Sequence, residues 1–274
     1  MPSIYAHQKF GDMVWEKLPK DERKIIRKYY QSFQIGLQGP DYLFFYKERP
    51  TDRPRRKGHK LHRMDAYDFM ENSVKIIREK GKESREYSYI LGFILHFVLD
   101  SECHPYIAVA EKETGCSHAE LECDFDYLML LKDHQVPHRY KLSQLVPTNI
   151  SIAECMEPFY DEDMTPVRIQ SALKRMKRVK KYYYVRNPLK RWTVETWLRK
   201  QKRYNRMYEQ AIFPFRNGKC EKQTDYLYEL AEKAVGVGVE LITNFRDAVD
   251  GGDLSKDFHK DFLGRKIKPE LDEL

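Results

Sequence analysis

The chain has 274 residues, of which 41% are hydrophobic and 33% charged, and its formal net charge is +7. Many aromatic residues beside few Gly and Pro exclude a disordered protein. The start lacks the basic and apolar regions of a signal peptide, and the longest apolar run, residues 89–99, is too short to span a bilayer. We therefore expect a soluble, cytoplasmic protein. Its five Cys lack the spacing of a small disulfide scaffold, which indicates reduced thiols.

Hydrophobic periodicity predicts an all-α fold with almost no strand signal. The expected helices cover residues 8–18, 20–33, 62–80, 85–103, 118–132, 165–183, 192–210 and 222–247. The Gly- and Pro-rich segment 33–60 is expected to be a loop, and ordered loops of this length tend to be functional. We expect one helical domain over residues 1–250 and a loosely attached polar tail over residues 251–274.

The first quarter of the chain contains several side chains that could bind a metal ion. His7 lies just before the first expected helix, and Asp41 ends a Gly-Pro turn in the stretch GLQGPDYLFF. His59 and His62 lie near the start of a later helix, and we prefer His62 because it opens the amphipathic stretch. Each residue alone is a weak signal, since an isolated His or a loop Asp is usually structural.

The apolar stretch YILGFILHFVLDSECHPY places His96, Asp100 and His104 at steps of four residues. On a helix these three side chains share one face, and a carboxylate there requires a neutralising partner. Asp100 lies midway, so it could bridge two metal ions. A buried, hydrogen-bonded His–Asp–His cluster without metal is the alternative. Pro105 disfavours helical geometry at the preceding residue, so we expect the helix to end there.

The next helix supplies a second His–carboxylate pair. Ser117 and Glu120 have the spacing of a capping box, so a helix begins beside His118. His118 and Glu122 are then one turn apart, which is a common ligand spacing. An antiparallel hairpin of the two helices would bring both pairs together, which favours metal binding over a metal-free cluster. A competing structural zinc site would use cysteines, namely Cys103, Cys116 and Cys123, but no C-x-x-C motif supports it.

Positive charge is concentrated in residues 167–222, which contain 18 Lys and Arg but three acidic residues. Tyr and Trp are interspersed among these cations, so nucleic acid or an anionic lipid surface are conceivable partners. A pair of solvated basic helices with aromatic residues facing the core is the simpler interpretation.

Together the candidate ligands occur in the order His7, Asp41, His62, His96, Asp100, His104, His118, Glu122. This order resembles the zinc-dependent phospholipase C family, which is related more distantly to the S1/P1 nucleases. The stretches that carry the resemblance are YAHQKFGD, GLQGPDYLFF, LHRMDAYDFM, YILGFILHFVLDSECHPYI and SHAELE, within residues 1–130. The resemblance implies an all-α domain that holds three zinc ions at one end of a helix bundle.

The resemblance also implies a role for each ligand. One zinc ion would be surrounded by Asp41, His62, His96 and Asp100. A second would be held by His104, His118 and Glu122. The third would be held by His7, by the backbone groups of the N-terminal residue and by a bridging Asp100. We therefore expect two to three zinc ions.

The activity implied is the hydrolysis of phosphodiesters by metal-activated water, with Asp41 as the general base. The expected substrate is a phospholipid or another phosphodiester, with transient contact to an anionic membrane surface. One alternative is a nuclease-like phosphoesterase in which residues 167–222 contact phosphates, although nucleic acid is the weaker candidate partner. The other alternative is a metal-stabilised binding protein without turnover.

Overall fold

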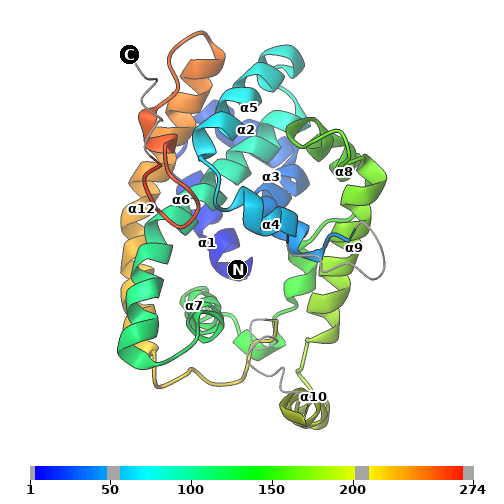
Figure 1. Cartoon of the computed structure of the whole chain (residues 1–274), viewed down its shortest axis with the longest axis vertical. Helices are drawn as coiled ribbons and strands as arrows, with labels where there is room; N and C mark the ends of the chain where they lie inside the picture. Colours follow the sequence, from blue (N-terminus) through cyan, green and yellow to red (C-terminus); the bar gives the residue numbers. More distant parts are fainter. Residues whose placement is uncertain (1–3, 48–55, 201–209, 268–274) are drawn as a thin grey trace.

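The computed structural model describes residues 4–47, 56–200 and 210–267, and within them the expected all-α fold is confirmed (Figure 1). The longer helices are α1 (Ile4–Trp15), α5 (Ala66–Lys80), α6 (Arg85–Thr114), α7 (His118–Lys132), α9 (Pro166–Tyr182), α10 (Pro188–Lys200) and α12 (Glu221–Val249). The shorter ones are α2 (Lys20–Lys28), α3 (Tyr30–Gly36), α4 (Arg56–Leu61), α8 (Ile150–Met156) and the 3₁₀ helices η1 (Gly39–Phe45), η2 (Pro137–Arg139), η3 (Leu142–Leu145), η4 (Glu157–Phe159) and η5 (Lys256–Phe258). None of the described helices is long and apolar enough to cross a membrane.

Helix α6 is the central element, and it is buried almost continuously from Tyr87 to Leu99. It packs against α3 backbone to backbone. A Cβ on Gly36 would lie 2.1 Å from the carbonyl oxygen of Tyr89, and one on Gly92 would lie 2.3 Å from that of Phe33. Only glycine permits so close an approach. The contact brings η1, which follows α3 in the chain, next to the middle of α6.

The expectation that this helix ends before Pro105 is wrong, because α6 continues to Thr114. Proline has no N–H, so the carbonyl of Ser101 loses its usual helical donor. The C-terminal segment crosses the helix at this point, and a Cβ on Gly264 would lie 2.3 Å from that carbonyl oxygen. Tertiary packing therefore outweighs the local preference, and the helix ends instead at Gly115, which adopts a left-handed conformation.

Other boundaries also differ from those expected. The helix expected over residues 20–33 is divided at Tyr29 into α2 and α3, and the expected loop 33–60 contains η1 and α4. Helix α5 begins at Ala66 because Asp65 caps it by accepting the N–H of Tyr67, so His62 belongs to the preceding turn. Of the helix expected over residues 192–210, residues 201–209 lie outside the described residues, and the described part, α10, begins earlier, at Pro188.

The sequence predicts a loosely attached C-terminal tail, but residues 251–267 pack against the rest of the protein. Phe258 and Phe262 are fully buried, and the N–H of Phe262 donates to the carbonyl of His62. Asp261 is 1% exposed and accepts the N–H groups of Leu263 and Arg265. The division of the chain at residue 250 stays a prediction, and residues 268–274 lie outside the described part.

Candidate metal centre

All eight side chains predicted as metal ligands lie together at one side of α6. They form three groups, and within each group three ligand atoms lie within 4.8 Å of one another. The groups are His7, His96 and Asp100; Asp41, His62 and His96; and His104, His118 and Glu122. Seven of the eight residues are buried, whereas the side chain of His118 is 36% exposed. The third group is therefore the one nearest to solvent.

Helix α7 brings its two ligands to α6 through a short connection. The predicted capping box at Ser117 and Glu120 is confirmed, and it starts α7 at His118. The Nε2 atom of His118 lies 3.0 Å from Glu122 Oε1, and the same oxygen lies 3.5 Å from His104 Nε2. Figure 1 views α7 nearly along its axis while α6 runs across the view, so the helices cross and do not form the expected antiparallel hairpin.

Helix α1 is held in place by a buried carboxylate from α7. Asp126 accepts the backbone N–H groups of Tyr5 at 3.0 Å and Ala6 at 2.7 Å, which otherwise have no partner in the first turn of a helix. This contact places His7 against the centre, where its ring stacks on that of His96 with centroids 4.2 Å apart. The predicted contribution of the chain's first residue concerns residues 1–3, which lie outside the described part.

Asp41 enters the centre from the first turn of η1. The preceding Gly39 has φ +47, and a Cβ there would lie 2.2 Å from the His96 ring. Glycine is therefore required at this position for two reasons, its left-handed backbone conformation and its close contact with the His96 ring. The turn aims Asp41 at His62, and Asp41 Oδ1 lies 3.0 Å from His62 Nε2.

Asp100 is the central carboxylate of the site. Its oxygens lie 3.3 Å from His7 Nε2, 3.3 Å from His96 Nε2 and 3.8 Å from His104 Nδ1. The Nε2 atom of His62 is 4.0 Å away. The Asp100 carboxylate thus lies within 4.0 Å of at least one histidine of each of the three groups, which is the arrangement expected of a bridging ligand.

Backbone carbonyls orient three of the histidines through Nδ1. These contacts join His62 to Gly58 at 2.7 Å, His96 to Leu37 at 3.2 Å and His104 to Phe262 at 2.7 Å. A carbonyl oxygen can only accept, so each contact places a proton on Nδ1. In the neutral form of each ring, the Nε2 atom then carries a lone pair that faces the ligand groups, as in metal-binding histidines.

Two local features test whether a cation fits here. The Nε2 atom of His96 is buried without a hydrogen-bond partner. When neutral His62 donates from Nδ1 to Gly58, its Nε2 and Asp41 Oδ1 are two acceptors only 3.0 Å apart. Such atoms repel each other unless a proton or a cation lies near both. Groups of three His and carboxylate ligands also match zinc sites that keep an open position.

The charges of the site stabilise one another. Burial alone would raise the pKa of Asp100, but His104 and His96 hold it well below its usual range. Burial likewise opposes ionisation of Glu122, yet His118 and His104 keep its pKa well below the usual value. Burial lowers the pKa of His104, but Asp100 and Glu122 outweigh this effect and raise it to about 9. The carboxylates therefore stay ionised, and a cation must displace the His104 proton.

The alternative ligand candidates lie outside these groups. His59 is exposed and packs edge-on against Phe44, whereas His62 is 6% exposed and faces Asp41. All five cysteines are buried, and none belongs to a ligand group among the described residues. Burial raises the pKa of Cys103 and Cys123, so both remain protonated thiols.

The sequence analysis did not predict the residues that orient the histidines, namely Gly58, Leu37 and Phe262. Their contacts use backbone carbonyls, which every residue type has, so no side-chain pattern marks them. The sequence signal nearest to them is Gly264, since Gly often marks a turn.

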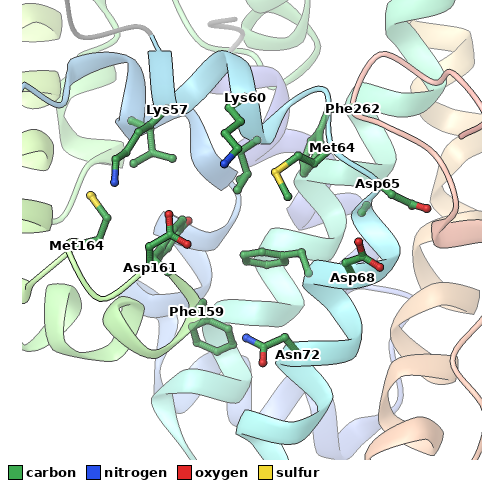
Figure 2. A pocket seen from close by; sticks show the side chains of 15 residues that line it. Lys57, Lys60, Met64, Asp65, Asp68, Asn72, Phe159, Asp161, Met164 and Phe262 are labelled. Atoms are coloured by element: carbon green, nitrogen blue, oxygen red, sulfur yellow. The ribbon is translucent and has the colours of Figure 1, made fainter.

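A cavity of about 290 Å³ lies beside the centre, between α4, α5 and the segment around η4. In Figure 2, Lys57 and Lys60 extend over it from α4, while Asp68 and Asn72 approach from α5. None of the eight ligands lines the cavity, but Phe262 does, and the ring of Phe262 also packs against that of His62 with centroids 5.2 Å apart. A ligand in the cavity would therefore be one side chain away from the centre.

Comparison with known proteins identifies one family. A family model described as zinc-dependent phospholipase C matches residues 6–203, which include all eight ligands. No curated protein and no solved structure matches the chain.

Proposed function

The chain belongs to the zinc-dependent phospholipase C family, a family of hydrolases, and we propose that it hydrolyses phosphodiesters at the centre around Asp100. The observation that carries the proposal is the convergence of three His–carboxylate groups on this one residue. A single structural ion would need only four ligands, whereas the chain assembles eight.

The ligand sets support two to three zinc ions. The third group, around His118, is separate from the other two. The first and second groups both include His96, whose Nε2 can serve only one ion, because its Nδ1 faces Leu37. Two complete sets therefore exist, and a third ion would rely on bridging by Asp100 and on His7. Zinc supplies a Lewis acid for the phosphoryl oxygens and lowers the pKa of water toward neutrality.

Asp41 is the proposed general base, which takes the proton of the attacking water at a carboxylate oxygen. Burial raises the pKa of Asp41, while the hydrogen bond from His62 and the charge of His96 lower it below the usual value. The hydrogen bond needs a proton on His62 Nε2. This contact between His62 Nε2 and Asp41 Oδ1 is therefore one of the effects that set the basicity of Asp41.

The test is hydrolysis by zinc-depleted and zinc-reloaded protein of a chromogenic phosphodiester, a phospholipid and single-stranded DNA. We expect the reloaded protein to cleave the first two substrates. His62→Ala should lose zinc and at least about 100-fold in rate, and His59→Ala, an exposed neighbour outside the ligand groups, should lose neither. Zinc-loaded protein that cleaves none of the three would be a binding protein. Cleavage of DNA alone would establish the nuclease-like alternative.

A further inference from the structure

Helix α10 presents large apolar side chains to solvent. Leu189 is 69% exposed, Trp192 is 63% exposed and Trp197 is 46% exposed. The third Trp of the chain, Trp15, is partly buried against the core. We call Leu189, Trp192, Trp197, Arg199 and Lys200 the α10 face. At 100° per residue these five positions fall on one side of the helix.

The opposite side of α10 makes only a narrow contact with the protein. Val194 is its one buried hydrophobic residue among those described, and it packs in a small cluster with Tyr183 and Phe213. The Nζ atom of Lys190 donates to the carbonyl of Tyr184 at 2.8 Å. Figure 1 shows α10 at the edge of the molecule, beyond the end of α9. The aromatic residues of the α10 face therefore do not form part of a core.

The charge around the α10 face is positive. Helix α10 contains four Lys and Arg and one acidic residue, Glu195, which pairs with Arg191 at 3.8 Å between Nε and Oε1. The neighbouring Tyr182 is 52% exposed, and Lys190 Nζ lies 5.8 Å from its ring. The surface thus combines exposed aromatic rings with cations and has no unpaired carboxylate on the helix itself.

We propose that the α10 face docks the protein on an anionic lipid bilayer surface. Trp and Leu on one face of a helix that also carries Lys and Arg favour the interface between lipid head groups and acyl chains. Arg199 and Lys200 would contact lipid phosphates, each contributing attraction to the negative surface. Aliphatic Leu189 on the same face as the two Trp favours lipid over nucleic acid, because nucleic-acid surfaces use stacking rings rather than alkyl groups. The inference does not depend on the proposed hydrolysis.

The test is co-sedimentation of the zinc-loaded protein with vesicles of phosphatidylcholine alone and with 30% phosphatidylserine. We expect binding to the anionic vesicles that falls in high salt. The double variant Trp192→Ala, Trp197→Ala should bind about tenfold more weakly. The matched control is Val167→Ser, which removes another side chain with 70% exposure. It lies at the start of α9, about 22 Å along the helix from Tyr182, and should bind like the wild type.

A second measurement keeps the test independent of the fold of the variants. Tryptophan emission of the wild type should shift to the blue on anionic vesicles and be quenched by brominated lipid. Arg199→Glu with Lys200→Glu should lose the anionic preference. The proposal would be overturned if the double Trp variant bound vesicles as strongly as the wild type and the Trp emission of the wild type did not change on anionic vesicles. A second outcome would also overturn the proposal: the double Trp variant keeps its vesicle binding but no longer binds a single-stranded oligonucleotide, or no longer self-associates.

Discussion

Asp100 lies at the middle of the centre, because its oxygens are within 4.0 Å of nitrogen atoms from four histidines. We expect Asp100→Asn to lower the zinc content more than any other single ligand change. The amide keeps the volume but loses the charge that would neutralise adjacent cations. Elemental analysis beside His118→Ala, at the exposed edge, checks this. Full zinc in Asp100→Asn together with loss in His118→Ala would show that Asp100 does not bridge.

Asp41 differs from the other ligands because it is aimed from a short 3₁₀ turn and paired with a single histidine. As a general base, Asp41→Asn should lower kcat by about 100-fold or more while removing less than one zinc ion per chain. Steady-state kinetics and metal analysis of the same sample separate the two effects. A proportional loss of zinc and of turnover would make Asp41 a ligand only.

Asp12, outside the centre, predicts a pH dependence of stability. Burial raises its pKa to about 6, although Gln8 donates a hydrogen bond to it. The folded state therefore favours the protonated carboxyl, and stability is lost as the pH rises from about 4 through 6. Asp12→Asn should stabilise the protein by about 1–2 kcal/mol at pH 8 and have no effect at pH 4. Denaturant unfolding at the two pH values checks this, and equal effects at both would contradict it.

At the scale of elements, the C-terminal segment is a structural part of the centre. The carbonyl of Phe262 orients His104, and Gly264 lies against Ser101 and Pro105 of α6. The segment reaches the same helix that supplies three of the ligands. This explains why α6 keeps its course past Pro105, and it links the fold of residues 251–267 to metal binding.

Gly264→Ala should therefore weaken zinc binding. Its φ is +72, and the added Cβ would meet the Ser101 carbonyl oxygen at 2.3 Å, so the segment must move and carry Phe262 with it. Loss of such an orienting contact costs about 10-fold or more in metal affinity. Gly81→Ala is the control, because Gly81 has φ +81 but no atom within 4 Å of the new Cβ. Equal zinc affinity of the two variants, measured by competition with a chelator, would show that only backbone strain matters.

Elements with strong local signals were predictable from the sequence, and those set by tertiary contacts were not. The apolar pattern predicted α6, and the capping box at Ser117 predicted the start of α7. Once both segments are helical, ligands four residues apart lie on one face of each helix. The extension past Pro105 and the crossing of α7 over α6 depend on packing, which periodicity does not encode. The short helices η1 and α8 have too few residues for a periodic signal.

At the scale of the whole molecule, the ligands come from elements far apart in the chain. His7 of α1 and Glu122 of α7 reach the same centre in two different ligand groups, and Asp126 of α7 holds the first turn of α1 in place. Their meeting could not be worked out from spacing and followed only from the family resemblance. The glycine contacts between α3 and α6 place Asp41 in the same way. Each of these contacts positions a ligand, so the bundle serves to assemble the centre.

Zinc stoichiometry tests the central claim most directly. Untagged protein, purified without any exposure to chelator, would be analysed for metals by mass spectrometry against its protein concentration. We predict two to three zinc ions per chain, because the eight ligands provide two complete sets and a bridging carboxylate. A chain that carries no zinc under these conditions would contradict the assignment of the centre and the hydrolytic function built on it.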